Sequence, residues 1–378
     1  MTETILTNAI LVLRSDLKRG TIVIRNGKIA EIVEGNSHAP GAIDVDGDYL
    51  MPGVVDVHTD NLERQVQPRV NARWPSRSAM LSHDQQTAAA GVTTVLDALC
   101  VGDLGFDVDR LKTFKDGVRD LDALADTGLL KSEHFLHLRC ETPAHDVIDL
   151  VEPVIDHPRV RMVSFMDHSP GVGQYADINN YRKIRRRAGM TEVQIEDRIV
   201  TLLEQRERLR RPNRDALLTL VRHLDVSLAS HDDQTVENIE ENVADGIMIS
   251  EFPVRMEAAL AARASGMTII AGAPNIVRGG SHSGNVGAAE MVRAGAVDAF
   301  ASDYVPAALV EAAFLSVEQC DLTLPEAVAM ITDAPARMAR LADRGRIEMG
   351  LRADILRVRV FEGTPVVRQV WRAGERVA

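Results

Sequence analysis

The sequence has few cysteines and few aromatic residues, it has no long apolar stretch, and it has no excess of positive charge. There is no run of about 18 apolar residues and no basic segment followed by an apolar one at the start, so we expect neither a membrane span nor a secretion signal. A net charge of −12 and an aromatic content of 4% argue against nucleic acid as a partner. The cysteines show no paired spacing, which argues against disulfides and fits a reducing cytoplasm. They are Cys100, Cys140 and Cys320.

The two ends of the chain share a pattern of short strands. The 378 residues, 45% of them hydrophobic, suffice for one large soluble domain and a smaller one. Near the N-terminus the pair Asn26-Gly27 stands between two β-branched runs and predicts a hairpin. Strand-like runs return at 345–359 and 365–377, so we expect both ends to contribute to one sheet beside a central domain.

Between these ends, strand-like runs alternate with helical stretches. This alternation predicts βα units and a parallel sheet. The segment 53–343 has a suitable length for a (β/α)8 barrel, with an open doubly wound sheet as the rival architecture. A long, polar, helical insertion is expected at 175–215, after the fourth strand. The predicted strands are 54–60, 92–99, 134–141, 160–168, 226–232, 246–252, 267–274 and 297–303.

Histidines and carboxylates stand at the carboxyl ends of five predicted strands, which is where the active sites of barrels gather. Any one of them has an ordinary explanation as a hydrogen-bonded loop side chain. Six such groups at five strand ends predict a metal site. Imidazoles and carboxylates suit zinc, manganese or iron, and a bridging carboxylate suits a two-metal centre. The six are His58, Asp60, Glu141, His168, His231 and Asp303.

Longer motifs resemble a known group of enzymes. MPGVVDVHTD (51–60), GVTTVLDA (91–98) and GRIEMGLRADILRV (345–358) resemble the amidohydrolase superfamily, and the likeness covers essentially the whole chain. HTDNLE (58–63), SFMDHSPGxGQ (164–174), LASHDD (228–233) and AGAPNIVRGGSHSGN (271–285) are similar to its diphosphatase branch, from the carbon–phosphorus lyase pathway of phosphonate metabolism. The resemblance implies a TIM-type, metal-dependent hydrolase barrel at 53–343. It also implies a small β-sandwich domain formed by 1–52 and 344–378.

The resemblance assigns roles to the polar strand-end residues. His58 and Asp60 correspond to the ligands on the first strand, where most of the superfamily has His-x-His. Glu141 corresponds to a carboxylate that bridges two metals, and His168 and His231 correspond to the ligands of the second metal. Our strand count places the glutamate and these two histidines one strand earlier than the usual assignment in the superfamily.

The reaction that the resemblance implies is hydrolysis of α-D-ribose 1-methylphosphonate 5-triphosphate to 5-phospho-α-D-ribose 1-methylphosphonate and diphosphate. Two divalent metals, zinc or else manganese or iron, would activate the attacking water. Asp303 would bind metal and accept the proton of this water, and His282 would assist the leaving diphosphate.

Two other classes of protein fit the same residues. One is a hydrolase of C–N bonds, such as a cyclic amidase or an N-acyl deacetylase, because the fold and the ligands do not decide the chemistry. The other is a non-catalytic scaffold of the same shape, which the full set of ligands disfavours. Whether the chain is a diphosphatase or a hydrolase of C–N bonds, we expect a homodimer in the cytoplasm.

The segment 278–285 has the composition of an anion-binding loop. Its glycines let backbone N–H groups approach a phosphate, and a helical pattern follows at 286–295. The arginine can form a bidentate contact with a phosphate, and the serines add donors. A flexible surface loop is the alternative interpretation. The predicted substrate contacts are Arg278, Gly279, Gly280, Ser281 and Ser283, together with Glu63 from the first strand end.

Further cationic side chains are candidates for the mouth of the barrel. Several arginines follow the first strand, and a basic run at 182–187 either covers a polyphosphate or forms a solvated helix face. The arginines after the first strand are Arg64, Arg69, Arg73 and Arg77.

Overall fold

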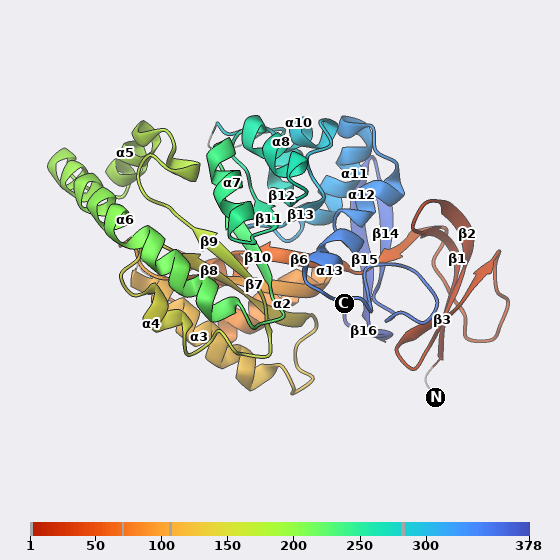
Figure 1. The fold of residues 1–378 in the computed structure, drawn as a ribbon. Coiled ribbons are helices and arrows are strands. Elements are labelled where there is room, and N and C mark those ends of the chain that lie inside the picture. Colours follow the sequence, from red (N-terminus) through yellow and green to blue (C-terminus); the bar gives the residue numbers. More distant parts are fainter. Residues whose placement is uncertain (1–2, 70–71, 106–107, 281–283) are drawn as a thin grey trace.

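A barrel of parallel strands occupies the centre of the computed structural model, which describes residues 3–69, 72–105, 108–280 and 284–378 (Figure 1). In these residues the sheet has eight strands, and they neighbour one another in the order of the sequence. This order confirms the (β/α)8 barrel over the open doubly wound sheet, and it also confirms the strand count. The strands are β6 (Val54–Thr59), β7 (Val92–Val101), β8 (Glu133–Glu141), β9 (Val160–Met166), β10 (Ser227–His231), β11 (Ile249–Glu251), β12 (Thr268–Gly272) and β13 (Ala299–Ala301).

The first and last strands meet at their carboxyl ends. Thr59 forms a parallel bridge with Asp303, just beyond β13. The Asp303 N–H donates to the His58 carbonyl at 3.0 Å, and the Asp60 N–H donates to the Asp303 carbonyl at 2.5 Å. These hydrogen bonds close the barrel beside the polar strand-end residues.

The barrel interior is mainly apolar, with His137, Ser164 and Glu251 buried in it as one hydrogen-bonded group. Strands of a closed parallel sheet are covered on both faces, which explains why β6 and β7 are buried along their whole length. Bulky side chains from the longer strands fill the interior, while the short strand β13 contributes alanines. The interior residues are Val55, Val57, Leu96, Phe135, Met162, Ala229, Ile249, Ile270, Ala299 and Ala301.

Helices surround the barrel (Figure 1). Among the described residues, no helix is long and apolar enough to cross a membrane. The helices are α1 (Asn61–Val66), α2 (Ser76–Ala89), α3 (Val108–Leu124), α4 (Val147–Val151), α5 (Ile178–Arg187), α6 (Glu192–Val221), α7 (Val236–Ala244), α8 (Met256–Ala264), α9 (Ala273–Val277), α10 (Ala288–Arg293), α11 (Ala308–Cys320), α12 (Leu324–Ala329) and α13 (Asp333–Met338), with a 3-10 turn η1 (Gly173–Tyr175).

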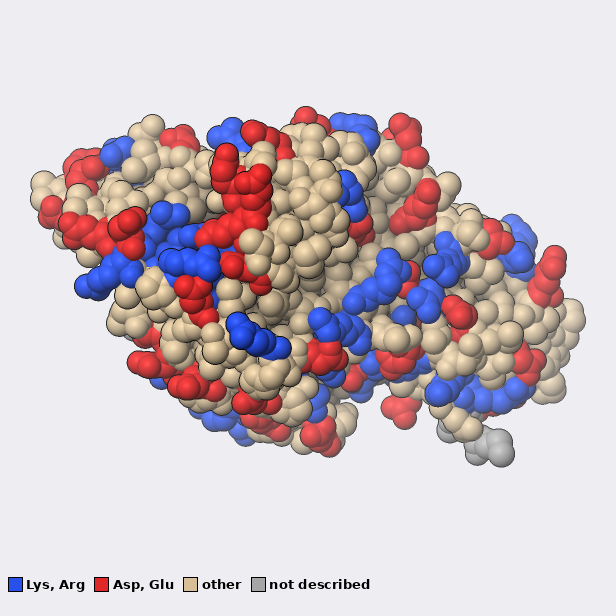
Figure 2. All heavy atoms as spheres, in the orientation of Figure 1, with Lys and Arg blue, Asp and Glu red and all other residues tan. Residues whose placement is uncertain are grey.

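The predicted helical insertion forms α5 and α6, which project from one side of the barrel in Figure 1. A capping box at Thr191 starts α6, because its hydroxyl and the Gln194 side chain satisfy backbone groups at the helix start. Figure 2 shows basic side chains of α6 beside acidic side chains of α7. Arg214 is buried and bonds Asp245 at 2.5 Å, so this ion pair fastens α6 to the end of α7.

The two chain ends contribute to one further sheet, as predicted. Strand β5 pairs antiparallel with β14, with Met51 opposite Leu356. Gly53 joins this sheet to the barrel, and a Cβ there would lie 2.3 Å from the Thr93 hydroxyl, so only glycine fits. The Asn26-Gly27 hairpin is confirmed, with φ of 49° and 76°. The path is β16 (Glu375–Arg376), β15 (Thr364–Arg372), β14 (Ile355–Phe361), β5 (Tyr49–Pro52), β1 (Glu3–Val12), β2 (Leu17–Arg25) and β3 (Lys28–Glu34), with β4 (Ile43–Asp44) beside β1.

A buried network of charged groups joins α2 to the barrel. The His134 ring nitrogens lie 2.8 Å from Asp97 and 3.1 Å from Asp84, so both donate to carboxylates. His83 lies 2.7 Å from Asp97 on one side and accepts from the Asn61 amide at 3.0 Å on the other. Burial opposes the charged form of His134, but the two carboxylates outweigh it and raise its pKa to about 9.

This network predicts a loss of stability in mild alkali. The folded pKa of His134 exceeds its usual 6.5, so its stabilising effect is complete below pH 6.5 and is lost as the pH rises through about 9. We expect the melting temperature of the wild type to fall more steeply across this range than that of His134→Asn, measured by circular dichroism. His223→Asn, at an exposed site, is the control and should keep the wild-type slope. Equal slopes for the wild type and His134→Asn would contradict the assignment.

Candidate metal and active site

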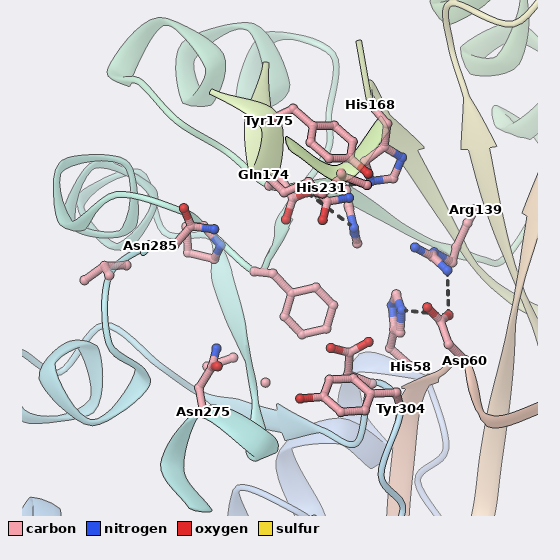
Figure 3. Close-up of a pocket in the computed structure, with 18 of the residues that line it drawn as sticks. His58, Asp60, Arg139, His168, Gln174, Tyr175, His231, Asn275, Asn285 and Tyr304 are labelled. Atoms are coloured by element: carbon pink, nitrogen blue, oxygen red, sulfur yellow. Dashed lines mark hydrogen bonds and ion pairs between the residues drawn. The ribbon is translucent and has the colours of Figure 1, made fainter. Parts of the chain in front are cut away.

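A pocket of about 440 Å³ opens at the carboxyl ends of the barrel strands (Figure 3). It lies where the sequence predicts the active site. Five of the six predicted metal ligands and Asp232, the aspartate next to His231, supply its acidic and imidazole groups. Arginines and amides line the pocket beside them. The polar lining residues include His58, Asp60, Arg110, Arg139, His168, Gln174, Tyr175, Arg185, His231, Asp232, Asn275, Asn285, Asp303 and Tyr304.

The backbone turns sharply where these strands end. Asp232, Phe252 and Asp303 follow β10, β11 and β13, and all have left-handed φ, between 55° and 57°. Each donates its N–H to a carbonyl of the neighbouring strand. Such conformations are uncommon outside glycine and persist where the surroundings hold them. They place the Asp232 and Asp303 side chains at the pocket and the Phe252 ring against both His58 and His231.

Glu251 holds two of the histidines in one orientation. Its carboxylate is fully buried and accepts hydrogen bonds from His58 Nδ1 at 2.8 Å and from His231 Nδ1 at 2.9 Å. Burial opposes ionisation of Glu251, but the imidazoles and these hydrogen bonds outweigh it and hold its pKa well below the usual range. Because an ionised carboxylate only accepts, both Nδ1 atoms carry hydrogen and both Nε2 atoms are left for a ligand in the pocket.

Glu141 has the same relation to the third histidine. It accepts a hydrogen bond from His168 Nδ1 and does not line the pocket. His168 Nε2 is buried and has no hydrogen-bond partner among the described residues. Such an atom costs free energy unless a ligand satisfies it. In this geometry Glu141 orients His168, whereas the sequence predicted that it bridges two metals.

The ligand atoms form two groups, each of which can hold a divalent ion. His168, His231 and Asp232 place one atom each within 4.8 Å of one another, and so do His58, Asp60 and Asp303. Burial opposes the charged form of His58, but Glu251 and Asp60 raise its pKa to about 10, so the site favours a cation at this ring. A divalent ion that displaces the proton satisfies the same preference. The nitrogen and oxygen donors therefore fit the predicted metal centre, and Asp232 joins the candidate ligands. The bridging role of Glu141 stays a prediction.

The two carboxylates beside the barrel closure differ in proton affinity. Burial opposes ionisation of Asp60, but Arg139, 2.5 Å away, outweighs it and lowers the pKa. Burial raises the pKa of Asp303 to about 6, and the charge of Asp60 adds to this. Asp303 is therefore the better proton acceptor near neutral pH.

Three arginines line one part of the pocket. Arg110 lies on α3, Arg139 on β8 and Arg185 on α5. Arg139 is buried against Asp60, and Arg185 is buried with its guanidinium 4.9 Å from the Tyr181 ring centre. The sequence analysis did not identify Arg110 or Arg139.

The described residues of the predicted phosphate loop are divided, because Asn285 lines the pocket and residues 278–280 do not. Arg278 and Gly279 are exposed, Gly280 is partly exposed, and none of them lines the pocket. Ser281, His282 and Ser283 lie outside the described residues. Past them, the chain returns to the pocket at Asn285, and α10 occupies only 288–293 of the predicted helical segment. Glu63 does not line the pocket and lies 3.5 Å from Arg110.

Most of the other predicted cationic groups face other partners. Arg64 donates to the Tyr304 carbonyl at 2.5 Å. Arg73 and Arg77 pair with Asp116 and Asp120, and Arg69 is not among the lining residues. The run at 182–187 is divided, because Arg185 lines the pocket whereas Arg182 and Arg186 pair with Glu196 and Glu192 at the surface. Arg182 and Arg186 therefore belong to a solvated helix face, and for Arg185 the contact with a polyphosphate stays a prediction.

Some signals for the missed residues were present in the sequence. Asp232 directly follows His231, and Arg139 stands two residues before Glu141. Glu251 is a lone carboxylate in a short apolar strand, and a buried carboxylate needs partners. Arg110 had no such signal.

Comparisons with known proteins agree with this fold and site. A model of the amidohydrolase family matches residues 271–378. Two solved structures share the fold over essentially the whole of both chains. One is N-isopropylammelide isopropylaminohydrolase from Burkholderia multivorans ATCC 17616 (17% identity, TM-score 0.65, 100% of this chain and 98% of that chain). The other is an N-acetyl-D-glucosamine-6-phosphate deacetylase mutant from Mycobacterium smegmatis (16% identity, TM-score 0.65, 100% of both chains).

The fold and the site define a barrel hydrolase of the amidohydrolase superfamily, to which the chain belongs. Within it, the chain is a member of the family of alpha-D-ribose 1-methylphosphonate 5-triphosphate diphosphatase from Escherichia coli (strain K12). It is 41% identical to that protein over 376 residues, which are 99% of this chain and 100% of the relative.

The position of Glu251 predicts a role in holding metal. Removing a carboxylate that orients metal-binding histidines typically costs about 10–100-fold in metal affinity. We expect Glu251→Gln to lose zinc at a chelator concentration that the wild type withstands, measured by mass spectrometry of the metal after dialysis. Glu257→Gln, on the exposed face of α8, is the matched control and should retain metal. Unchanged retention in Glu251→Gln, with a wild-type melting temperature, would contradict this role.

Proposed function

We propose that the chain hydrolyses α-D-ribose 1-methylphosphonate 5-triphosphate to 5-phospho-α-D-ribose 1-methylphosphonate and diphosphate. The observation that carries the proposal is the pocket, where three imidazoles and three aspartates adjoin three arginines. The full-length relative is a diphosphatase of this ribosyl triphosphate. A polyanionic substrate needs such positive charge, whereas a neutral amide does not.

Two divalent metals fit the two ligand groups, and zinc is our first assignment, with manganese or iron as alternatives. We assign one metal to His168, His231 and Asp232, and the other to His58, Asp60 and Asp303. When bound, such ions lower the pKa of a coordinated water and neutralise charge on phosphoryl oxygens. Glu141 and Glu251 hold the histidines behind them.

Asp303 is the proposed acceptor of the proton from the attacking water. The water oxygen forms a bond to the phosphorus nearest the ribose, the bond from this phosphorus to the bridging oxygen breaks, and diphosphate leaves with the electron pair. A carboxyl with a pKa of about 6 is ionised at neutral pH and can accept the proton. The arginines stabilise negative charge on the phosphoryl oxygens and on the leaving group.

The roles predicted for the glycine-rich loop stay predictions. His282, Ser281 and Ser283 lie outside the described residues, and the exposed Arg278 can contact substrate only if it turns toward the pocket. For Glu63 we propose a supporting role, because it adjoins Arg110 and does not line the pocket.

We also propose that the enzyme acts in the cytoplasm. Its three cysteines are unpaired and buried, in keeping with a reducing compartment. The predicted homodimer stays a prediction.

The first test is diphosphate release by metal-reconstituted protein, with the ribosyl triphosphate, ATP and a panel of cyclic amides as parallel substrates. We expect diphosphate from the ribosyl triphosphate, and we expect chelator or His168→Ala to abolish its release. His223→Ala, at an exposed site, should retain activity. Turnover of amides without diphosphate release would favour the hydrolase of C–N bonds instead.

A second test concerns Asp303. Loss of a proton acceptor typically costs about 100–10,000-fold, so Asp303→Asn should lower kcat by this order. Asp321→Asn is the matched control, because Asp321 is an exposed residue with a similar left-handed φ of 57°, which asparagine tolerates. Near-wild-type turnover of Asp303→Asn would remove the proposed role.

A further inference from the structure

The pocket is electrically asymmetric. Its positive side chains come from α3 after β7, from β8 itself and from α5 after β9. These three strands are neighbours on one side of the barrel. The opposite wall comes from segments after β11, β12 and β13. The metal-ligand histidines on β6 and β10 lie between these two sides. Figure 3 shows Arg139 across the pocket from Asn275 and Asn285.

The positive side is a connected cluster formed by Arg110, Arg139 and Arg185. Burial raises the pKa of Tyr175, and the charges of Arg185 and Arg110 act against this rise, so both guanidinium groups lie near its hydroxyl. Arg110 also feels the charge of Arg139. Asp60 pairs with Arg139 and Glu63 lies 3.5 Å from Arg110, so carboxylates hold these two guanidinium groups in place.

Apart from the Asp303 carboxylate beside the metal-ligand histidines, the opposite side is polar and uncharged. Among its described lining residues none is Lys or Arg, and the polar groups are the amides of Asn275 and Asn285 and the Tyr304 side chain. Apolar side chains stand beside them, namely Phe252, Val286 and Met291. Amides and a phenol form hydrogen bonds with sugar hydroxyls without attracting a polyphosphate.

We infer that the substrate binds in one orientation, with its two terminal phosphates against Arg110 and Arg185 and its ribosyl methylphosphonate against Asn275, Asn285 and Tyr304. This inference rests on the proposed function and adds the subsite for the leaving diphosphate. The orientation places the phosphorus nearest the ribose between the two sides, beside His58, His231 and Asp303. It also assigns the anion contacts to the arginine cluster, and it does not need Arg278.

The helical insertion supplies part of this subsite. Arg185 is the buried residue of the basic run, and the Tyr181 ring supports its guanidinium while it lines the pocket. An arginine held in this way offers donors in a fixed plane, which suits phosphate oxygens. The insertion therefore contributes to specificity for a long phosphate chain.

The test compares two product ligands by isothermal titration calorimetry on metal-loaded protein, with metal content measured before and after each titration. The ligands are inorganic diphosphate and 5-phospho-α-D-ribose 1-methylphosphonate. A charge-assisted contact is worth roughly 10–100-fold in affinity. We expect Arg185→Met and Arg110→Met to weaken diphosphate by this order and to leave the ribosyl ligand within about twofold. Asn275→Ala should weaken the ribosyl ligand and leave diphosphate unchanged.

Controls separate this inference from folding effects. Arg187→Met changes an exposed arginine of the same helix and should leave both affinities unchanged. If Arg185→Met does not fold, Arg185→Lys takes its place, because it keeps the positive charge. We expect Arg185→Lys to weaken diphosphate binding less than Arg110→Met does. Thermal melting monitors the folded state of every variant.

Two outcomes would overturn the orientation. One is weaker diphosphate binding in Arg278→Met with no change in Arg185→Met or Arg110→Met, and the other is a loss of ribosyl binding in the arginine variants. Binding of diphosphate requires no turnover. Absence of ribosyl triphosphate hydrolysis, with diphosphate binding that still depends on Arg185, would therefore overturn the proposed function and not the anion subsite.

Discussion

The site depends on the two backbone hydrogen bonds that close the barrel between the first strand end and Asp303. They join the end of the first barrel strand to the turn after the last one. The residues that form them also carry the candidate ligand groups. Because the closing contact involves backbone atoms of His58, Asp60 and Asp303, the side chains of these residues project into one pocket. The apolar filling of the barrel keeps the strands in register beneath them.

Buried carboxylates form a second layer behind the site. Glu251 bonds two histidines that stand on different strands, and Glu141 bonds the third. At all three rings a carboxylate accepts a hydrogen bond from Nδ1, and Nε2 is available on the pocket side. This arrangement gives the centre a preference for cations before any metal arrives, which suits an enzyme whose substrate brings several negative charges.

The distribution of charge separates the catalytic centre from substrate recognition. The candidate metal ligands stand at the ends of β6, β9, β10 and β13, while the arginines come from α3, β8 and the helical insertion. Solved structures with other substrates share the fold, so the proposed specificity for a polyphosphate rests on these arginines and not on the barrel.

Periodicity, turn signals and the polar residues at strand ends were enough to predict the barrel, its eight strands, the sheet shared by the chain ends and five of the groups near the metal centre. These features are local, because a buried strand, a hairpin and a strand-end histidine each leave a pattern within a few residues. The functions of Glu251, Arg110 and Arg139 depended on tertiary structure, because each acts through residues on other strands or helices. The same holds for Glu141 and Arg278. Their chemistry suggested a metal bridge and a phosphate contact, but only the folded chain decided which atoms reach the pocket.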